Sequence, residues 1–247
     1  HYDLIIIGAG PAGMSAAIYA SKNDMTVLVL DDQPAGGGQV YRHVMQNAAA
    51  QNKAQFLGND YWSGHKLAND FTLSSAAFWP ESRVWQITKD RDVFFSQKGK
   101  AHRAQADAIL IATGAMERPM PIAGWTLPGV MTIGAAQTML KTSQSGVDGA
   151  LFVGSGPLFY LMIWQYLNAG FDIKAVIDTA PGRMSLISYL WALPALLQPN
   201  MLMKGLKWRS EIRRKTRYIS GATAVSISGA GKADAINFTD AGGEKHR

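Results

Sequence analysis

A glycine-rich turn set between a buried strand and a helix limits the fold of this chain more than any other feature. The run Asp3–Gly8 is continuously apolar after its first residue, which is typical of a strand buried on both faces of a parallel sheet. Pro11–Asn23 carries mainly small and apolar residues and predicts a helix, and Thr26–Leu30 is a second apolar run that ends before Asp31. The order strand, turn, helix, strand predicts a βαβ unit over Tyr2–Asp31.

The turn has the Gly-x-Gly-x-x-Gly spacing of dinucleotide-binding units. Gly8 permits the tight turn out of the strand, and Gly10 lets the backbone approach a pyrophosphate without a Cβ atom in the way. Gly13 allows the helix to pack closely on the strand. The helix begins at Pro11 and Ala12, and its N-terminus offers free N–H groups to phosphates. We expect these residues to bind a dinucleotide; a glycine-rich turn without a ligand is the alternative.

Asp31 lies 23 residues after Gly8, at the end of the second strand. A carboxylate in this place can accept hydrogen bonds from both ribose hydroxyls, and its charge would repel a 2′-phosphate. The spacing predicts a dinucleotide but does not choose between FAD and NAD.

Later segments resemble parts of two-domain flavoproteins, and this resemblance favours FAD. One segment is the loop after Asp31, and the other is the end of a buried strand at 108–112. The residues that the resemblance assigns to FAD are Asp32, Gln33, Gly38, Gln39, Ala112, Thr113 and Gly114. Tyr41 and Arg42 follow the loop, and they either reach the flavin or its phosphates or pack against the loop.

Four blocks together resemble one group of flavoproteins that work in multi-chain enzymes. The blocks are residues 30–34, 37–42, 112–119 and 124–131. The group comprises the A subunit of opine oxidase, the B subunit of hydrogen cyanide synthase, and the alpha-type subunits of sarcosine oxidase and hydroxyproline dehydrogenase. The resemblance implies an FAD domain interrupted by a second nucleotide-type domain. It also implies an amine or amino-acid substrate and a partner flavoprotein subunit.

Members of this group return to the FAD domain after the inserted one. This chain ends at Arg247, inside or just after the second domain. We therefore expect that the chain is a fragment, that its gene is truncated, or that another chain completes the flavin pocket.

The strand, turn, helix and acid pattern occurs a second time. A proline-rich loop over 117–128 is the best boundary, which predicts an FAD-binding domain over 1–120 and a second nucleotide-binding domain over 121–247. The second cycle has strands at 149–153 and 173–177 with a helix at 158–169 between them. The predicted fold class is α/β, with two Rossmann-like, three-layer units, the second inserted in the first.

The second turn departs from the first at its third glycine. Gly154 and Gly156 are kept and Pro157 follows, but Phe159 stands where a glycine would. A phenylalanine there would push the helix off the strand or fill the space that a nucleotide needs. Asp178 is 24 residues after Gly154, so a carboxylate is available for a ribose contact. The second unit either binds NAD or an adenine nucleotide or has kept the fold and lost the ligand.

Other segments complete the expected fold. Residues 44–56 predict a helix, and residues 84–88 and 93–96 predict strands, with 98–106 as a hairpin arm. The apolar stretch 184–208 contains Pro194 and Pro199, so no membrane span is expected. The segment 191–207 packs on its own domain, contacts a partner protein or, least favoured, lies on a membrane surface.

Composition excludes several kinds of chemistry. The chain has no cysteine, which excludes disulfides, zinc-thiolate sites and redox-active cysteine pairs within it. The five histidines show no metal-ligand spacing, so no metal is expected, and no catalytic residue can be named.

The net charge of +6 includes a basic run over 204–217, which we interpret as a solvated helix face and not as a nucleic-acid site. A cytoplasmic location is the simpler interpretation.

Two functional hypotheses remain. The chain is an FAD-dependent oxidoreductase subunit, in which the flavin ring carries the electrons. The alternative is a non-catalytic nucleotide-binding or assembly subunit.

Overall fold

A computed structural model describes residues 1–50, 54–181 and 199–247. These residues divide into two compact units, one of 1–116 with 141–144 and the other of 117–140 with 145–247. The domain boundary expected between residues 120 and 121 stays a prediction.

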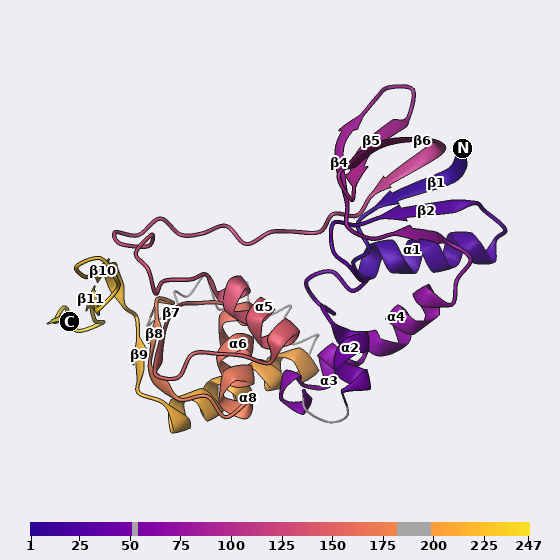
Figure 1. The fold of residues 1–247 in the computed structure, drawn as a ribbon. Helices are drawn as coiled ribbons and strands as arrows, with labels where there is room; N and C mark the ends of the chain where they lie inside the picture. Colours follow the sequence, from indigo (N-terminus) through magenta and orange to yellow (C-terminus); the bar gives the residue numbers. More distant parts are fainter. Residues whose placement is uncertain (51–53, 182–198) are drawn as a thin grey trace. The chain divides into compact units, whose positions relative to one another are not determined.

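The first unit is built on a six-stranded sheet with the order β3-β2-β1-β6-β5-β4 (Figure 1). The strands β1 (Tyr2–Ile7), β2 (Val27–Leu30) and β3 (Ala77–Trp79) pair in parallel. The strands β4 (Ser82–Ile87) and β5 (Asp92–Gln97) form an antiparallel meander. The apolar residues of β1 and β2 thus lie at the centre of the sheet, as their burial requires.

The strand β6 (Lys100–Ile111) joins the two parts of this sheet. Its first half pairs with β5 in antiparallel fashion, and its second half pairs with β1 in parallel. The hairpin arm expected over 98–106 and the strand expected over 108–112 are thus both present, but as one continuous strand. The expected burial of the second part is wrong, because Leu110 is 38% and Ile111 65% exposed. The apolar and polar residues alternate through the junction without a turn, so the backbone continues extended across it.

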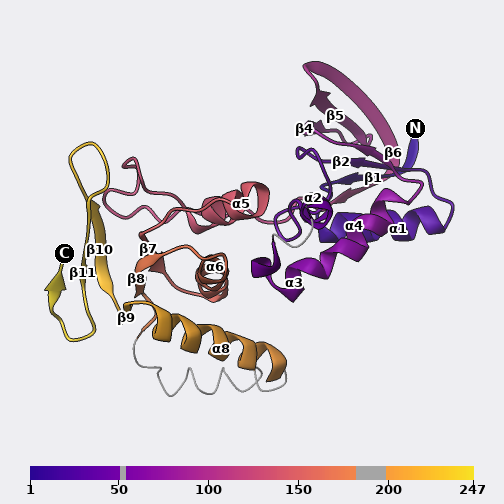
Figure 2. The same ribbon diagram turned by 60° about the horizontal axis from the view of Figure 1, so that its bottom comes forward.

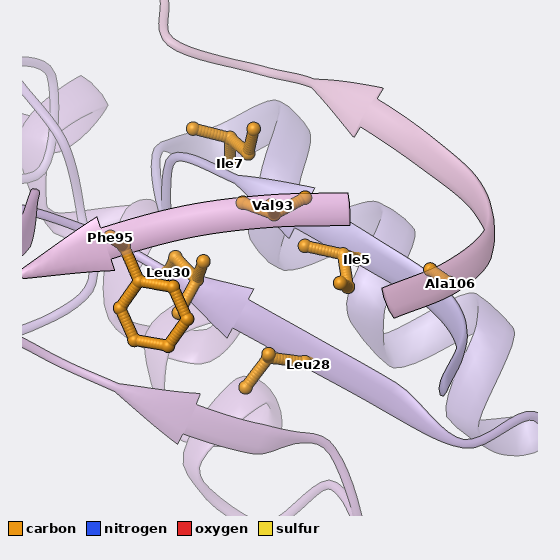
Figure 3. Packing of buried hydrophobic residues seen from close by; sticks show 7 residues of the cluster. All are labelled: Ile5, Ile7, Leu28, Leu30, Val93, Phe95 and Ala106. Atoms are coloured by element: carbon orange, nitrogen blue, oxygen red, sulfur yellow. The ribbon is translucent and has the colours of Figure 1, made fainter. Parts of the chain in front are cut away.

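Helices cover one face of the parallel strands and the meander covers the other. Both α1 (Pro11–Lys22) and α4 (Gly64–Thr72) lie on the helical face, and α1 contacts β1 and β2 (Figure 2). On the other face, Val93 and Phe95 of the meander pack against Ile5 and Leu28 in one buried cluster (Figure 3). This arrangement is the expected three-layer α/β unit.

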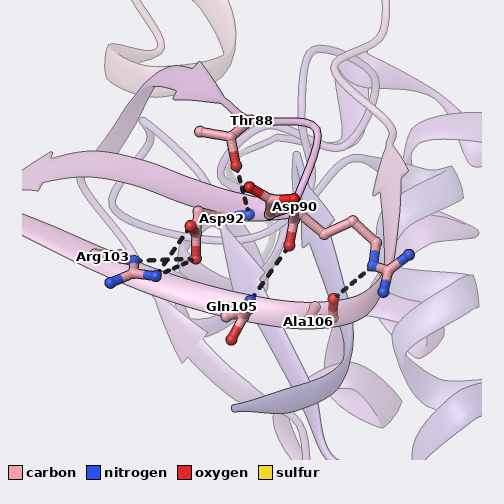
Figure 4. Close-up of polar contacts among 7 residues, drawn as sticks. Thr88, Asp90, Asp92, Arg103, Gln105 and Ala106 are labelled. Carbon is pink, nitrogen blue, oxygen red and sulfur yellow. Dashed lines mark hydrogen bonds and ion pairs between the residues drawn. The ribbon is translucent and has the colours of Figure 1, made fainter.

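A group of polar contacts holds the meander together (Figure 4). Arg103 makes two hydrogen bonds to the carboxylate of Asp92, each 3.0 Å long. Gln105 donates to the carbonyl of Asp90, and Thr88 accepts from the backbone of Asp92. These contacts tie β6 to the start of β5 and to the turn between β4 and β5.

The helix expected over 44–56 is shorter than its composition suggested. The described part is α2 (Val44–Ala49), followed after residues 51–53, which lie outside the description, by the 3₁₀ turn η1 (Gln55–Leu57) and then α3 (Asn59–Trp62). Leu57 is buried in that 3₁₀ turn. Tertiary packing therefore overrides the helix propensity of this segment.

The second unit contains a smaller parallel sheet in the order β7-β8-β9. Its strands are β7 (Ala150–Gly154), β8 (Ile173–Asp178) and β9 (Tyr218–Ser220), with α6 (Pro157–Asn168) between the first two. The helix α8 (Pro199–Lys215) precedes β9. The strand-turn-helix-strand repeat expected here is thus present.

The rest of the second unit is a helix and an antiparallel sheet. The helix α5 (Ile133–Ser143) begins in this unit, and the strands β10 (Thr223–Ser228), β11 (Ala235–Thr239) and β12 (Lys245–His246) follow β9. Residues 184–198 of the apolar segments noted above lie outside the described residues, and residues 199–208 lie in α8. No helix among the residues described is both long and apolar enough to cross a membrane.

Candidate functional site

The first glycine turn is packed so closely that side chains are excluded at two positions. A Cβ atom on Gly13 would lie 1.9 Å from the carbonyl oxygen of Gly8. Gly8 itself has a φ of +105°, and its Cβ would lie 2.4 Å from the carbonyl oxygen of Ala112. The helix α1 therefore sits directly on the turn, as the glycine spacing requires.

Gly10 differs from its two neighbours because space surrounds it. Its φ is −73°, and a Cβ there would meet only the Cα of Gly38, at 3.9 Å. Pro11 and Ala12 open α1 directly after it, and no side chain caps this helix. The first backbone N–H groups of α1 are thus available for an anion.

Asp31 lies beside this turn, with its carboxylate held by the backbone alone. Ala9 donates to Oδ2 at 2.5 Å and Gln33 donates to Oδ1 at 2.8 Å. Among the described residues, no side chain donates to it, and Asp31 is only partly buried. Since a carboxylate has about four acceptor positions, Asp31 can still accept hydroxyl donors.

The loop after Asp31 holds several of the predicted residues together. Gln33 donates to Asp32 at 2.8 Å and accepts from Arg42 Nη1 at 2.6 Å. The buried Nε of Arg42 has no partner among the described residues. Such an atom costs free energy unless a ligand or water satisfies it.

Tyr41 and Gly38 have packing roles in the same loop. The ring of Tyr41 lies where a Cβ on Gly64 of α4 would be, 2.2 Å from that position. Gly38 has a φ of +56°, and its Cβ would lie 2.8 Å from the Cα of Gly10. This geometry favours the packing alternative for Tyr41 and leaves Arg42 as the residue with an unsatisfied donor.

The third predicted segment also reaches this edge. The strand β6 ends at Ile111, and the N–H of Ala112 then donates to the carbonyl of Ile7 at 2.8 Å. Thr113 follows beside Gly8, and Gly114 has a φ of +69° with open space around it. The turn, the acid, the loop and the strand end therefore meet at the carboxyl ends of β1, β2 and β6, where α/β folds bind ligands. The individual roles of these residues stay predictions.

Sequence reasoning missed a buried lysine that holds the loop in the first unit. Lys141 is 4% exposed, and its Nζ donates to the carbonyls of Gln39, at 2.8 Å, and Val40, at 3.0 Å. Burial, followed by the nearby charge of Arg42, lowers the pKa of Lys141 to about 8. No local pattern marks this lysine, because its partners lie about a hundred residues earlier.

Two further polar side chains extend this network. Asn47 donates to the carbonyl of Lys141 at 2.9 Å and to the hydroxyl of Tyr61 at 2.7 Å. The hydroxyl of Tyr61 donates to the carbonyl of Arg42 at 2.7 Å. The backbone at the C-terminal end of the loop, residues 39–42, is therefore held by buried polar groups.

The second turn has the same strand pairing but different surroundings. Phe159 is 3% exposed, and its ring lies 3.3 Å from where a Cβ on Gly154 would be. Gly156 is unobstructed, and Pro157 begins α6. Asp178 is fully buried at the end of β8. The nucleotide contacts expected at this turn stay predictions.

One group of possible metal ligands occurs among the described residues. Asp240, Glu244 and His246 place their ligand atoms within 4.8 Å of one another in the C-terminal hairpin. Asp240 already accepts hydrogen bonds from His246 and from the backbone of Glu244. These bonds account for the cluster as part of the hairpin.

Comparisons with known proteins agree with this geometry. A family model described as pyridine nucleotide-disulphide oxidoreductase matches residues 2–171. The A subunit of opine oxidase from Rhizobium meliloti is 39% identical over 255 residues, which cover 99% of this chain and 48% of that protein. The HcnB subunit of hydrogen cyanide synthase from Pseudomonas aeruginosa is 32% identical over 82% of this chain and 43% of its own length. The chain thus spans about half the length of these relatives.

Solved structures share the fold at low sequence identity. L-proline dehydrogenase from P. horikoshii superposes with a TM-score of 0.64 at 15% identity, over the whole of this chain and 40% of that one. Thioredoxin reductase from T. acidophilum superposes with a TM-score of 0.61 at 19% identity, over 99% of this chain and 73% of that one. These likenesses support the two-domain, disulfide-reductase-like fold.

Proposed function

Because the chain belongs to the pyridine nucleotide-disulphide oxidoreductase family, whose cofactors are FAD and NAD(P), we propose that its first unit binds FAD. We further propose that it works as an oxidoreductase subunit on an amine, an opine or an amino or imino acid, beside a partner flavoprotein subunit. A cytoplasmic location belongs to the same proposal.

The carboxylate of Asp31 is the observation that carries the FAD proposal. It is fixed by two backbone N–H groups, at 2.5 and 2.8 Å, and keeps acceptor positions free. In the proposal it accepts the ribose hydroxyls of the adenosine half. The N-terminus of α1, reached past Gly10, receives the pyrophosphate. A bound FAD would supply two-electron chemistry on its ring.

Arg42 adds a second argument for a ligand at this edge. Its buried Nε is unsatisfied, while Nη1 is held by Gln33 at 2.6 Å. A guanidinium fixed on one side and unpaired on another is suited to an anionic or carbonyl acceptor. In the proposal, Arg42 donates to the cofactor, and Lys141 positions Arg42 by holding the preceding loop.

The substrate class and the partner rest on the relatives alone. The names of the relatives describe subunits of an opine oxidase and of a hydrogen cyanide synthase, so both relatives are parts of larger enzymes. The absence of cysteine gives this chain no redox-active disulfide of its own. We therefore favour carbon–nitrogen oxidation over disulfide reduction.

The test uses the protein purified alone and together with a candidate partner flavoprotein subunit. We expect a visible flavin spectrum, FAD on extraction, and bleaching when opines or amino acids are added without oxygen. Asp31→Ala should lose the flavin, whereas the control Asp107→Ala, at an exposed acid of β6 outside the site, should keep it. A colourless protein that takes up no added FAD would contradict the proposal. Flavin without bleaching by any amine, in both preparations, would favour the non-catalytic alternative.

A further inference from the structure

The two turns of this chain place an acid at the same position. In the first unit Gly8 follows β1, and its N–H bonds to Leu30, just before Asp31. In the second unit Gly154 is paired with Asp178 across β7 and β8. Both acids thus end the strand beside the glycine turn, where a ribose-binding carboxylate is expected.

The carboxylate of Asp178 is already occupied. Its Oδ2 accepts hydrogen bonds from the hydroxyl of Tyr160, at 2.6 Å, and from the hydroxyl of Tyr218. Its Oδ1 accepts from the N–H of Ala180 at 2.9 Å, and Arg209 Nη2 lies 4.0 Å from Oδ2. Asp178 is 0% exposed, whereas Asp31 is partly exposed. A ribose diol would have to displace both phenols to reach this oxygen.

Arginines of the basic run cover the two tyrosines. The guanidinium carbon of Arg209 lies 6.0 Å from the ring centre of Tyr160, and that of Arg213 lies 4.9 Å from the ring centre of Tyr218. These are cation–π distances. The helix α8 therefore places two members of the basic run beside these tyrosines, while Arg213 is exposed and the side chain of Arg209 is 40% exposed.

Phe159 obstructs the turn itself. In the first unit even a methyl group at Gly13 would collide with the turn. Phe159 holds the corresponding place in the second unit, buried, with its ring 3.3 and 3.6 Å from the Cβ position of Gly154. The ring of Phe159 thus lies between α6 and the glycine turn and fills the space beside that turn.

We infer that the second unit does not hold NAD(H) or NADP(H), and that Asp178, with Tyr160 and Tyr218, is a buried anchor that joins β8, α6 and β9. This goes beyond the proposed function, because it excludes one electron donor or acceptor for the flavin, namely a pyridine nucleotide bound in the second unit. Electrons then enter and leave the first unit's cofactor by another route.

The test is ligand binding to the full-length protein saturated with FAD, so that the first turn is filled. NADH and NADPH are titrated to millimolar concentration by calorimetry, and the thermal midpoint is recorded at each addition. We expect no binding heat and no change in midpoint. Saturable binding of either dinucleotide that Asp178→Asn abolishes and Asp31→Asn retains would overturn the inference. Binding that Asp31→Asn abolishes belongs to the first turn and counts against the proposed FAD occupancy instead.

The anchor role has its own measurement, on apoprotein without any nucleotide. Tyr218→Phe and Tyr160→Phe each remove one phenol from Asp178, and each should lower the thermal midpoint. Tyr19→Phe is the control, because Tyr19 is an exposed residue of α1, and it should leave the midpoint unchanged. Midpoints of Tyr218→Phe and Tyr160→Phe equal to that of the wild type would overturn the anchor. These variants are conservative, so the measurement does not depend on Asp178→Asn folding.

Discussion

The ammonium group of Lys141 donates a hydrogen bond to the carbonyl oxygen of Gln39, 102 residues earlier in the chain. The cation is buried, and the neighbouring charge of Arg42 is also positive. Lys141 therefore holds the loop of the first unit at an electrostatic cost.

That cost predicts an unusual dependence of stability on pH. The pKa of Lys141 is about 8 in the folded chain and 10.5 at its ordinary value. Between these values the unfolded chain binds more protons, so the free energy of unfolding rises with pH, by up to about 1.4 kcal/mol per pH unit. Urea titrations of the wild type and of Lys141→Met at several pH values measure the difference. An equal slope in the two proteins would contradict the buried cation.

The glycines of the first turn predict two different defects. Gly13→Ala places a methyl group 1.9 Å from the carbonyl oxygen of Gly8, so we expect a loss of about 3 kcal/mol or more in stability. Gly10→Ala meets only a Cα at 3.9 Å, so stability should change by less than about 1 kcal/mol. Flavin content should nevertheless fall in Gly10→Ala, because the methyl group faces the expected pyrophosphate.

Chemical denaturation and flavin extraction on both variants separate these effects. A Gly10→Ala protein that folds and keeps its flavin would show that the pyrophosphate lies elsewhere.

The tyrosines around Asp178 should ionise late. Burial, and next the hydrogen bond to Asp178, hold the pKa of Tyr160 and that of Tyr218 above the ordinary value of 10.0. Asp178→Asn removes the negative charge that opposes ionisation, so part of the ultraviolet tyrosine titration should move to lower pH. The same titration in Asp32→Asn is the control and should match the wild type. No shift in Asp178→Asn would mean that the phenols do not face the carboxylate in solution.

The ion pair of the meander should matter more than an exposed pair. Arg103 holds Asp92, whose side chain is 12% exposed, by two hydrogen bonds. Arg103→Ala should cost about 1–2 kcal/mol, because it leaves a mostly buried carboxylate unpaired. Lys66 pairs with Asp70 on an exposed helix face, and Lys66→Ala should cost less than about 0.5 kcal/mol. Equal losses in the two variants, measured by denaturant unfolding, would contradict this ranking.

The parts of this fold that sequence reasoning could predict are those with a local cause. The turn at Gly8, the helix at Pro11 and the acid at Asp31 each follow from neighbours a few residues away. The continuous strand β6 did not, because whether residues 98–112 contain a turn depends on their pairing with β5 and β1.

The candidate site divides in the same way. Asp31 and Asp178 have nearly the same spacing from their glycines, yet Asp31 is partly exposed and accepts two hydrogen bonds, whereas Asp178 is fully buried and accepts three. The difference comes from Tyr218, 40 residues beyond Asp178, and from Tyr160 across the turn. Lys141 was missed for the same reason. Side chains from distant parts of the sequence determine which acid can bind a ligand. The spacing between the glycines and the acid does not predict these side chains.

The continuous strand β6 has a consequence for how the first unit opens. One strand carries the ladder hydrogen bonds of the meander and those of the parallel sheet, and it ends where Ala112 meets the glycine turn. The meander cannot detach without loosening the strand that supports the turn. Amide hydrogens along 100–111 should therefore exchange with solvent as a single cooperative block. Thermal unfolding that begins in the β4–β5 hairpin would then also disrupt the end of β6 beside the glycine turn.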